Sequence, residues 1–315
     1  MPASEDASFR RYFRIWRDGE TFIVMDAPPE KIGLDAYLTI GGMLTAIGVH
    51  VPRVLAEEHG RGFLLVTDLG TRQYLEDLEL GQHVEAHYLD AMMALSRIQS
   101  RGHAHAAHLP PYDRKLLERE LQLMPEWFCE RHLRLELTDD ERALLAEAFE
   151  FLMREALAQP QVFVHRDYHS RNLMVCPGDN PGILDFQDAV RGPVAYDVVS
   201  LFRDCYVGWP AERVREWVLR YREMAATAGV DVGADERQFT RWFDLMGVQR
   251  HLKVLGIFAR LCHRDRKRDY LDDLPLTLRY VLDVCGRYAE LAELARFLET
   301  RAIPLLATRR AEAGA

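Results

Sequence analysis

Residues 164–188, which read VHRDYHSRNLMVCPGDNPGILDFQD, decide the fold of this chain. Two short apolar runs, 173–175 and 183–184, flank a segment rich in Gly, Pro and Asn. Apolar runs separated by turn-forming residues are typical of a β-hairpin. The sequence therefore predicts two short strands, with polar residues just before the first and just after the second.

Three of these polar residues have a spacing that suits phosphoryl transfer. Asp167 precedes Asn172 by five positions, and Asp185 follows the second strand. Transfer from ATP needs positioning and charge neutralisation, which a carboxylate at the attacking hydroxyl and oxygen ligands for Mg²⁺ can supply. We predict Asp167 as the catalytic base and Asn172 and Asp185 as magnesium ligands. Each residue alone could simply cap a turn, so the prediction depends on all three together.

The first 68 residues have the pattern of a small antiparallel sheet with one helix. Residues 9–16 alternate with a period of two, and Asp18-Gly19 is a hairpin turn signal. The predicted elements are strands at 9–16, 21–25, 52–56 and 63–67 and a helix at 34–47.

Amphipathic helical patterns dominate the chain after Gly70. Thr138 and Glu141 form a capping-box signature at the start of one of them. The predicted helices span 83–100, 116–124, 139–158, 196–205, 211–226, 236–263 and 276–298. This order predicts an α+β, protein-kinase-like fold. Its nucleotide-binding lobe of antiparallel β-sheet would span 1–68, and a larger helical lobe with the catalytic loop and acceptor site would span 69–315.

Composition excludes several classes of function. The net charge of -9 argues against nucleic acid, which favours a basic surface. The five cysteines are scattered without C-x-x-C spacing, which indicates a reduced, cytoplasmic protein. No apolar run is long enough to span a membrane. We expect no nucleic-acid or membrane partner, and a monomer is the default expectation.

Longer stretches of the sequence resemble those of known protein families. The HxDxxxxN loop, the metal hairpin and Gly192-Pro193 before Asp197 resemble the aminoglycoside phosphotransferase and choline kinase superfamily. More closely, four strings resemble the bacterial anomeric kinases of N-acetylmuramate and N-acetylglucosamine. They are ASFRRYFR at 7–14, MDAPP at 25–29, HRDYHSRNL at 165–173 and LDFQDA at 184–189. The resemblance implies ATP and Mg²⁺ as cofactors, an amino sugar as substrate and a role in peptidoglycan recycling of cell-wall sugars.

A protein substrate is disfavoured. Asp185 and Asp197 are 12 positions apart, too few for an activation loop and a peptide-docking segment, and the A-P-E element is absent. The acceptor is therefore expected to be a small molecule.

The nucleotide side departs from the common kinase pattern. Residues 4–11 contain no glycine, and the strand at 21–25 ends without the usual phosphate-pairing Lys. We predict that Ser8 supplies a hydroxyl and that Arg11 or Arg14 reaches the phosphates. Lys31 is the alternative cation, and the arginines could instead line the outer face of an edge strand. In a kinase-like fold the adenine would pair with backbone groups near Thr67 and Leu69.

The acceptor side is predicted from charged residues in the second lobe and from the loop around the base. The candidates for substrate contact are His169, Asp188, Arg203 and Arg250. For these residues a solvent-facing loop position, a turn or the polar edge of a buried helix remain alternatives. His165 is predicted to hold the catalytic loop. The superfamily resemblance implies the same supporting role for Asp197.

The predicted function is an ATP-dependent sugar 1-kinase that phosphorylates the anomeric hydroxyl of N-acetylmuramate and N-acetylglucosamine. Another small-molecule phosphotransferase, acting on an aminoglycoside, choline or homoserine, is an alternative within the same class. A catalytically weak nucleotide-binding scaffold is the alternative outside it. The missing Lys favours the scaffold, whereas the retained Asp167, Asn172 and Asp185 oppose it.

Overall fold

A computed structural model describes residues 2–4 and 10–313 of the chain. It contains two compact units, each built from three separate segments. The first unit comprises Met1–Pro110, Val162–Arg191 and Met224–Val230, and the second comprises Pro111–Gln161, Gly192–Glu223 and Asp231–Ala315. The first unit therefore includes both the N-terminal sheet and the catalytic hairpin, and does not end at residue 68. The functional lobe boundary at 68/69 stays a prediction.

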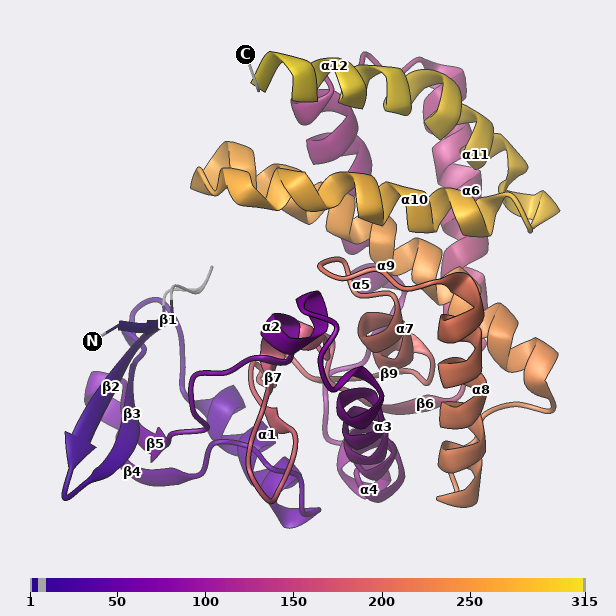
Figure 1. Cartoon of the computed structure of the whole chain (residues 1–315). Helices are drawn as coiled ribbons and strands as arrows, with labels where there is room; N and C mark the ends of the chain where they lie inside the picture. The colour runs from indigo at the N-terminus through magenta and orange to yellow at the C-terminus, as the bar shows by residue number, and fades with distance from the viewer. Residues whose placement is uncertain (1, 5–9, 314–315) are drawn as a thin grey trace. The chain divides into compact units, whose positions relative to one another are not determined.

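The N-terminal sheet has five antiparallel strands in the order β1-β2-β3-β5-β4 (Figure 1). The strands are β1 Pro2–Ser4, β2 Arg11–Arg17, β3 Glu20–Asp26, β4 Val54–Glu58 and β5 Phe63–Thr67. Asp18 and Gly19 join β2 to β3 with positive φ angles of 53° and 83°, as a two-residue hairpin turn requires. The four predicted strands are confirmed, and β1 is an additional one.

Helices of the first unit begin with α1, which spans Asp35–Ala46. Tyr37, Ile40 and Leu44 are its buried residues, and their spacing of three and four places them on one face. Three further helices follow the sheet: α2 Tyr74–Glu79, α3 Val84–Arg101 and α4 His103–Ala106.

The predicted catalytic hairpin is confirmed. Strand β7, Leu173–Met174, pairs antiparallel with β8, Gly182–Ile183, with Leu173 opposite Ile183. Two flanking strands, β6 Gln161–Val164 and β9 Val190–Pro193, form a second two-stranded sheet. The catalytic loop therefore starts at the end of one short strand, and the metal loop starts at the end of another.

Helices make up the second unit, and the last turn of α8, from Met224, belongs to the first. They are α5 Arg114–Leu121, a π-helical segment Met124–His132, α6 Asp139–Leu157, α7 Tyr196–Phe202, α8 Ala211–Thr227, α9 Glu236–Asp265, α10 Leu274–Cys285, α11 Ala292–Phe297 and α12 Ile303–Ala313, with short 3-10 or π-helical turns at Arg268–Asp273, Ala289–Leu291 and Leu298–Ala302. The capping box of α6 is confirmed: the Glu141 amide donates to Thr138 Oγ1 at 3.2 Å, and the Thr138 amide donates to Glu141 Oε2 at 2.9 Å.

One predicted helix, 276–298, is wrong as a continuous element. It breaks after α10, whose C-cap is Gly286, and resumes at the Ala289–Leu291 turn. Glycine has a low helix propensity, and the amides of Gly286 and Arg287 close the end of α10 by bonding to Leu282 and Val284.

Helix α9 is the central element of the second unit and contacts α6, α7 and α10. Figure 1 shows α10 beside it. Gly256 permits a close approach, because a Cβ atom there would lie 2.3 Å from the carbonyl carbon of Leu123. No helix within the described residues is long and apolar enough to cross a membrane.

Candidate active site

Backbone and amide hydrogen bonds connect the three predicted catalytic residues. Asn172 donates from Nδ2 to the carbonyl of Asp167 at 2.9 Å, and the carbonyl of Asn172 accepts from the Leu184 amide at 2.9 Å. Leu184 immediately precedes Asp185. The structure therefore places Asp167, Asn172 and Asp185 on adjacent segments of one unit, which the sequence spacing predicted.

Two non-glycine residues in this region have left-handed backbone conformations. Arg166, directly before Asp167, has a φ of 79°, and Asp185 has a φ of 58°. Such conformations cost about 1–2 kcal/mol outside glycine and are frequent where function requires a particular side-chain direction. The strain adjoins the predicted base and coincides with a predicted metal ligand.

Phe186 anchors the metal loop to helix α1. Its ring is fully buried and lies 4.8 Å from the ring of Tyr37, centroid to centroid. Gly41 leaves room for it, since a Cβ atom at that position would lie 3.2 Å from the Phe186 ring. The residue after Asp185 is therefore fixed by packing, which in turn fixes the carboxylate. Gln187 adds a hydrogen bond from Nε2 to Asp185 Oδ1 at 2.6 Å.

His165 has the features of a structural residue. It is fully buried, and burial lowers its pKa to about 4, although the nearby Asp167 carboxylate opposes the change. A neutral ring can accept, and Nδ1 accepts from the Asp167 amide at 3.3 Å. These contacts support the predicted role of His165 in holding the loop.

The donor set fits Mg²⁺. Asn172 uses its amide nitrogen toward Asp167, and in the part of the chain that the structure describes no hydrogen bond to its Oδ1 is present. One amide oxygen and one carboxylate suffice for Mg²⁺, which retains several waters. Between residues 10 and 313 there is no cluster of three or more His, Cys, Asp or Glu side chains that could hold a metal by itself. Asn172 and Asp185 would thus share the ion with the phosphates.

The nucleotide-side predictions have mixed outcomes. Ser8 lies outside the described residues. Arg11 forms an ion pair with Asp26 across the β2–β3 ladder and is 65% exposed. Arg14 binds Asp68 through Nε at 2.5 Å and through Nη2 at 3.0 Å, and it also donates to the carbonyl of Gly70 at 2.7 Å. The contact of Arg11 and Arg14 with phosphates stays a prediction.

Arg14 therefore stabilises the linker after β5. Burial would raise the pKa of Asp68, but hydrogen bonds from Arg14 and the Gly70 amide outweigh it and lower that pKa. Thr67 donates its amide to the Arg53 carbonyl at 3.0 Å, and the Leu69 carbonyl accepts from Cys176 Sγ at 3.4 Å. Adenine contacts at Thr67 and Leu69 stay predictions, with the Thr67 amide already bonded within the protein.

The loop candidates for acceptor contact lie beside Asp167, the predicted base. The amide of His169 donates to the Asp167 carbonyl at 3.1 Å, and His169 is half-buried. Asp188 is exposed, and its carbonyl accepts from Arg166 Nη1 at 3.4 Å. Both positions are compatible with substrate contact, which stays a prediction.

Arg203 forms an ion pair with the buried Asp244 in the second unit. Its Nη2 lies 2.7 Å from Asp244 Oδ1, and its guanidinium stacks over Phe243 at 4.4 Å. Arg287 and Tyr288 also bind the Asp244 carboxylate, at 2.9 Å each. Burial lowers the pKa of Arg203, and Asp244 opposes the shift. These contacts give Arg203 a structural role that the sequence analysis did not predict, and its contact with the acceptor stays a prediction.

Three more ionisable residues in the middle of α9 are also buried within the second unit. Arg250 donates to Cys205 Sγ at 3.7 Å, His251 Nε2 bonds to the Arg203 carbonyl at 2.9 Å, and Lys253 bonds to Tyr196 Oη at 2.9 Å. Asp197 is fully buried in the first turn of α7. The substrate role of Arg250 and the loop-bracing role of Asp197 stay predictions.

We expect Arg203→Met to destabilise the protein by about 3 kcal/mol. The substitution leaves the buried Asp244 with one guanidinium partner fewer, and breaking a buried ion pair costs several kcal/mol. Urea denaturation followed by circular dichroism measures the loss.

Arg114→Met is the matched control. It removes an ion pair with Glu150 in the same unit, in which both side chains are about half exposed, so it should cost less than about 1 kcal/mol. An Arg203→Met variant of unchanged stability but raised KM for the acceptor would contradict the structural role and favour substrate contact.

Sequence reasoning missed several residues around the site. Arg10 is 6% exposed and lies near Tyr37; burial raises the Tyr37 pKa and Arg10 opposes the rise. Tyr168 is fully buried and donates from Oη to the Ala91 carbonyl at 2.9 Å. The only available signal was their position beside recognised motifs, because both contacts join segments far apart in sequence.

The catalytic loop, metal hairpin and N-terminal sheet together define a phosphotransferase of the kinase-like fold. The chain belongs to the phosphotransferase enzyme family, whose model matches residues 1–234. The predicted family, fold class and enzyme class are therefore confirmed.

The sequences and structures of individual proteins support this family assignment. The chain is 48% identical to an N-acetylmuramate/N-acetylglucosamine kinase of Pseudomonas aeruginosa, covering 95% of this chain and 87% of that protein. A kinase of the same description from Pseudomonas putida is also 48% identical, with 94% and 86% covered. Plasmodium vivax ethanolamine kinase shares the fold at 14% identity, with a TM-score of 0.62 over 88% of this chain and 79% of that one.

Proposed function

We propose that this chain is an ATP- and Mg²⁺-dependent kinase of N-acetylmuramate and N-acetylglucosamine that phosphorylates the anomeric hydroxyl. The observation that carries the proposal is 48% identity, over 95% of the chain, to a kinase described by those two sugars. The arrangement of Asp167, Asn172 and Asp185 supports it. A role in peptidoglycan recycling in the cytoplasm, as a monomer, belongs to the same proposal.

Asp167 is the residue that acts on the acceptor. Its carboxylate orients the anomeric hydroxyl toward the terminal phosphate of ATP. It receives the proton as the new O–P bond forms and the bond from that phosphorus to the leaving ADP breaks. An anomeric hydroxyl is more acidic than other sugar hydroxyls, so orientation is a large part of the contribution. Hydrogen bonds from Asn172 to the Asp167 carbonyl and from the Asp167 amide to His165 keep the Asp167 backbone in place.

Asn172 and Asp185 hold the metal in this proposal. Bound Mg²⁺ supplies positive charge to the phosphate oxygens in the transition state. The packing of Phe186 on α1 and the hydrogen bond from Gln187 fix the direction of the Asp185 carboxylate before the nucleotide arrives. Because the Asp185 carboxylate already has a fixed direction, metal binding costs less conformational entropy at this ligand.

Phosphorus NMR of the products tests the proposal. The protein is incubated with ATP, Mg²⁺ and, separately, N-acetylmuramate, N-acetylglucosamine, an aminoglycoside and ethanolamine. We expect a sugar 1-phosphate, identified by coupling of phosphorus to the anomeric proton, with the first two only. Phosphorylation of the aminoglycoside or ethanolamine alone would replace the proposed substrate class. ATP binding without any product would favour the scaffold.

A further inference from the structure

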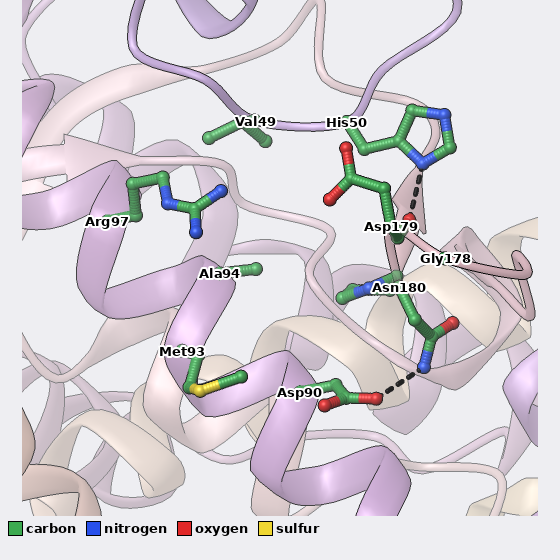
Figure 2. A pocket seen from close by; sticks show the side chains of 10 residues that line it. Val49, His50, Asp90, Met93, Ala94, Arg97, Gly178, Asp179 and Asn180 are labelled. Atoms are coloured by element: carbon green, nitrogen blue, oxygen red, sulfur yellow. Dashed lines mark hydrogen bonds between the residues drawn. The ribbon is translucent and has the colours of Figure 1, made fainter.

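A pocket of ≈ 380 Å³ lies within the first unit and contains none of the residues assigned to the reaction. Its walls are the segment after α1 at Val49 and His50, one face of α3, and the loop between β7 and β8 (Figure 2). A volume of this size suits a small ligand. The pocket is therefore separate from the predicted reaction site.

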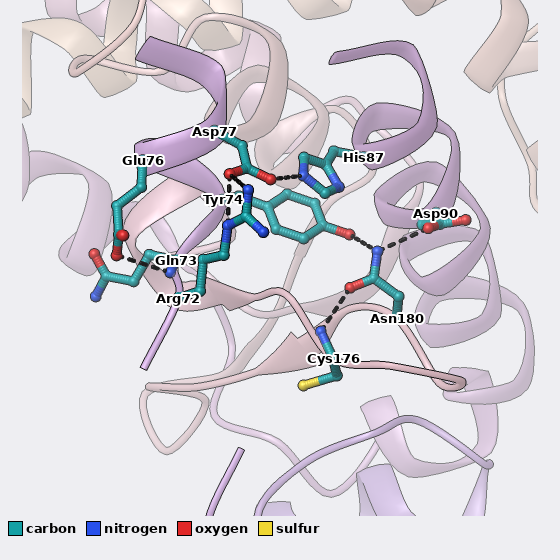
Figure 3. Close-up of polar contacts among 9 residues, drawn as sticks. All are labelled: Arg72, Gln73, Tyr74, Glu76, Asp77, His87, Asp90, Cys176 and Asn180. Atoms are coloured by element: carbon teal, nitrogen blue, oxygen red, sulfur yellow. Dashed lines mark hydrogen bonds and ion pairs between the residues drawn. The ribbon is translucent and has the colours of Figure 1, made fainter. Parts of the chain in front are cut away.

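Hydrogen bonds hold the walls in place. His50 donates from Nδ1 to the Asp179 carbonyl at 2.6 Å, and its own carbonyl accepts from Ile183 in β8 at 2.8 Å. Asn180 donates to Asp90 at 2.7 Å and to the Tyr74 hydroxyl at 2.6 Å (Figure 3). The β7–β8 loop is thus attached on both sides, and the pocket exists before any ligand binds.

The same wall is supported by the buried Asp77 carboxylate, which contacts His87 and Arg72. Burial would raise the pKa of Asp77, but hydrogen bonds from His87 and Arg72 outweigh it and lower that pKa. The Tyr74 ring stacks on His87 at 4.2 Å, which fixes the hydroxyl that accepts from Asn180 (Figure 3). These contacts hold the β7–β8 loop in one position, so this wall of the pocket is more rigid than a surface loop without such contacts.

Charges of both signs face the pocket without pairing with one another. Arg97 makes one hydrogen bond, from Nη1 to the Gly48 carbonyl, and over the described ranges it has no carboxylate partner. Asp90 accepts only from Asn180, and within the same ranges the Asp179 carboxylate has no hydrogen-bond or ion-pair partner. Figure 2 shows the Arg97 guanidinium and the Asp179 carboxylate turned toward each other from opposite sides.

The helix spacing sets how far apart the Asp90 and Arg97 side chains begin. Asp90 and Arg97 are seven residues apart on one face of α3, which is about 10 Å along the axis. Met93 and Ala94 lie between them and give the floor an apolar character. One or two residues of a peptide, at about 3.5 Å each, fit between side chains that begin about 10 Å apart.

We propose that this pocket binds a small zwitterion, an amino acid or dipeptide with free termini. Arg97 binds its carboxylate, Asp90 and Asp179 bind its ammonium group, and Met93 and Ala94 contact an apolar side chain. Each unpaired charge of the pocket then has an opposite charge in the ligand.

Isothermal titration of the full chain with alanylalanine and with L-alanine tests this proposal. We expect at least one of them to bind with a Kd of about 1 mM or tighter. N-acetyl-alanylalanine lacks the ammonium group and alanylalaninamide lacks the carboxylate, so both should bind at least tenfold more weakly than alanylalanine. Arg97→Gln and Asp90→Asn should each weaken binding at least tenfold. Arg61→Gln, an exposed arginine outside the pocket, should leave it unchanged.

The comparison of capped and uncapped peptides uses the unmodified protein, so this test of the proposal does not depend on whether the variants fold. No binding of either zwitterion below 10 mM, about tenfold above the expected Kd, overturns the proposal. Equal affinity for the capped peptides, or an unchanged Kd in a folded Arg97→Gln protein, also overturns it.

Discussion

Replacing Asp167 by Asn should lower kcat by about 10³-fold while leaving the Kd for ATP within about twofold. A positioned general base contributes roughly 10²–10⁴-fold, and Asn keeps the shape of the side chain but cannot accept the proton. The loop should persist, because Asn172 bonds to the Asp167 carbonyl and His165 bonds to its amide, neither of which the substitution removes. Steady-state kinetics with the sugar and separate titration of ATP measure the two quantities.

Asp140→Asn is the control for this experiment. It makes the same chemical change at an exposed position in the first turn of α6, so kcat should not change. An Asp167→Asn enzyme that loses ATP affinity as strongly as turnover would assign Asp167 to nucleotide binding instead of proton transfer.

Replacing Asp185 by Asn should raise the Mg²⁺ concentration for half-maximal activity by at least about tenfold and lower kcat at saturating Mg²⁺ by about 10²-fold. Even outer-sphere partners of a metal contribute roughly 10–100-fold, and Asp185 is proposed as a direct ligand. Asn retains a neutral oxygen but removes the negative charge that attracts the ion. Activity measured against Mg²⁺ at fixed ATP gives both values.

Asp179→Asn is a matched control from the same hairpin, because it removes an exposed carboxylate from the loop between β7 and β8. Its magnesium dependence should equal that of the unmodified enzyme. A magnesium dependence in Asp185→Asn that also equals the unmodified enzyme's would remove Asp185 from the ligand set.

The hairpin that brings the three predicted catalytic residues together could be predicted from sequence because the arrangement is local. Asp167, Asn172 and Asp185 lie within 19 consecutive residues, and a short hairpin determines how they meet. Turn chemistry and apolar patterning specify such a hairpin without reference to the rest of the chain. The same locality explains why the capping box of α6 was correctly predicted.

The partners of the charged residues could not be predicted in this way. Arg14 meets Asp68 across 54 positions, and Arg203 meets Asp244 across 41. Periodicity shows that a charge lies on a strand or helix but not which distant side chain neutralises it. The sequence analysis therefore named neither Asp68 as the partner of Arg14 nor Asp244 as the partner of Arg203.

The contact between Phe186 and Gly41 has a consequence for protein engineering. Exchanging helix glycines for alanine is a common way to raise thermal stability, since glycine in a helix costs about 1 kcal/mol. The adjacent glycines of α1 are not equivalent targets. A methyl group on Gly42 meets nothing within 4 Å, whereas one on Gly41 presses on the ring that positions the metal loop. We expect Gly42→Ala to raise the melting temperature and leave turnover intact, whereas Gly41→Ala should displace the Phe186 ring and lower turnover.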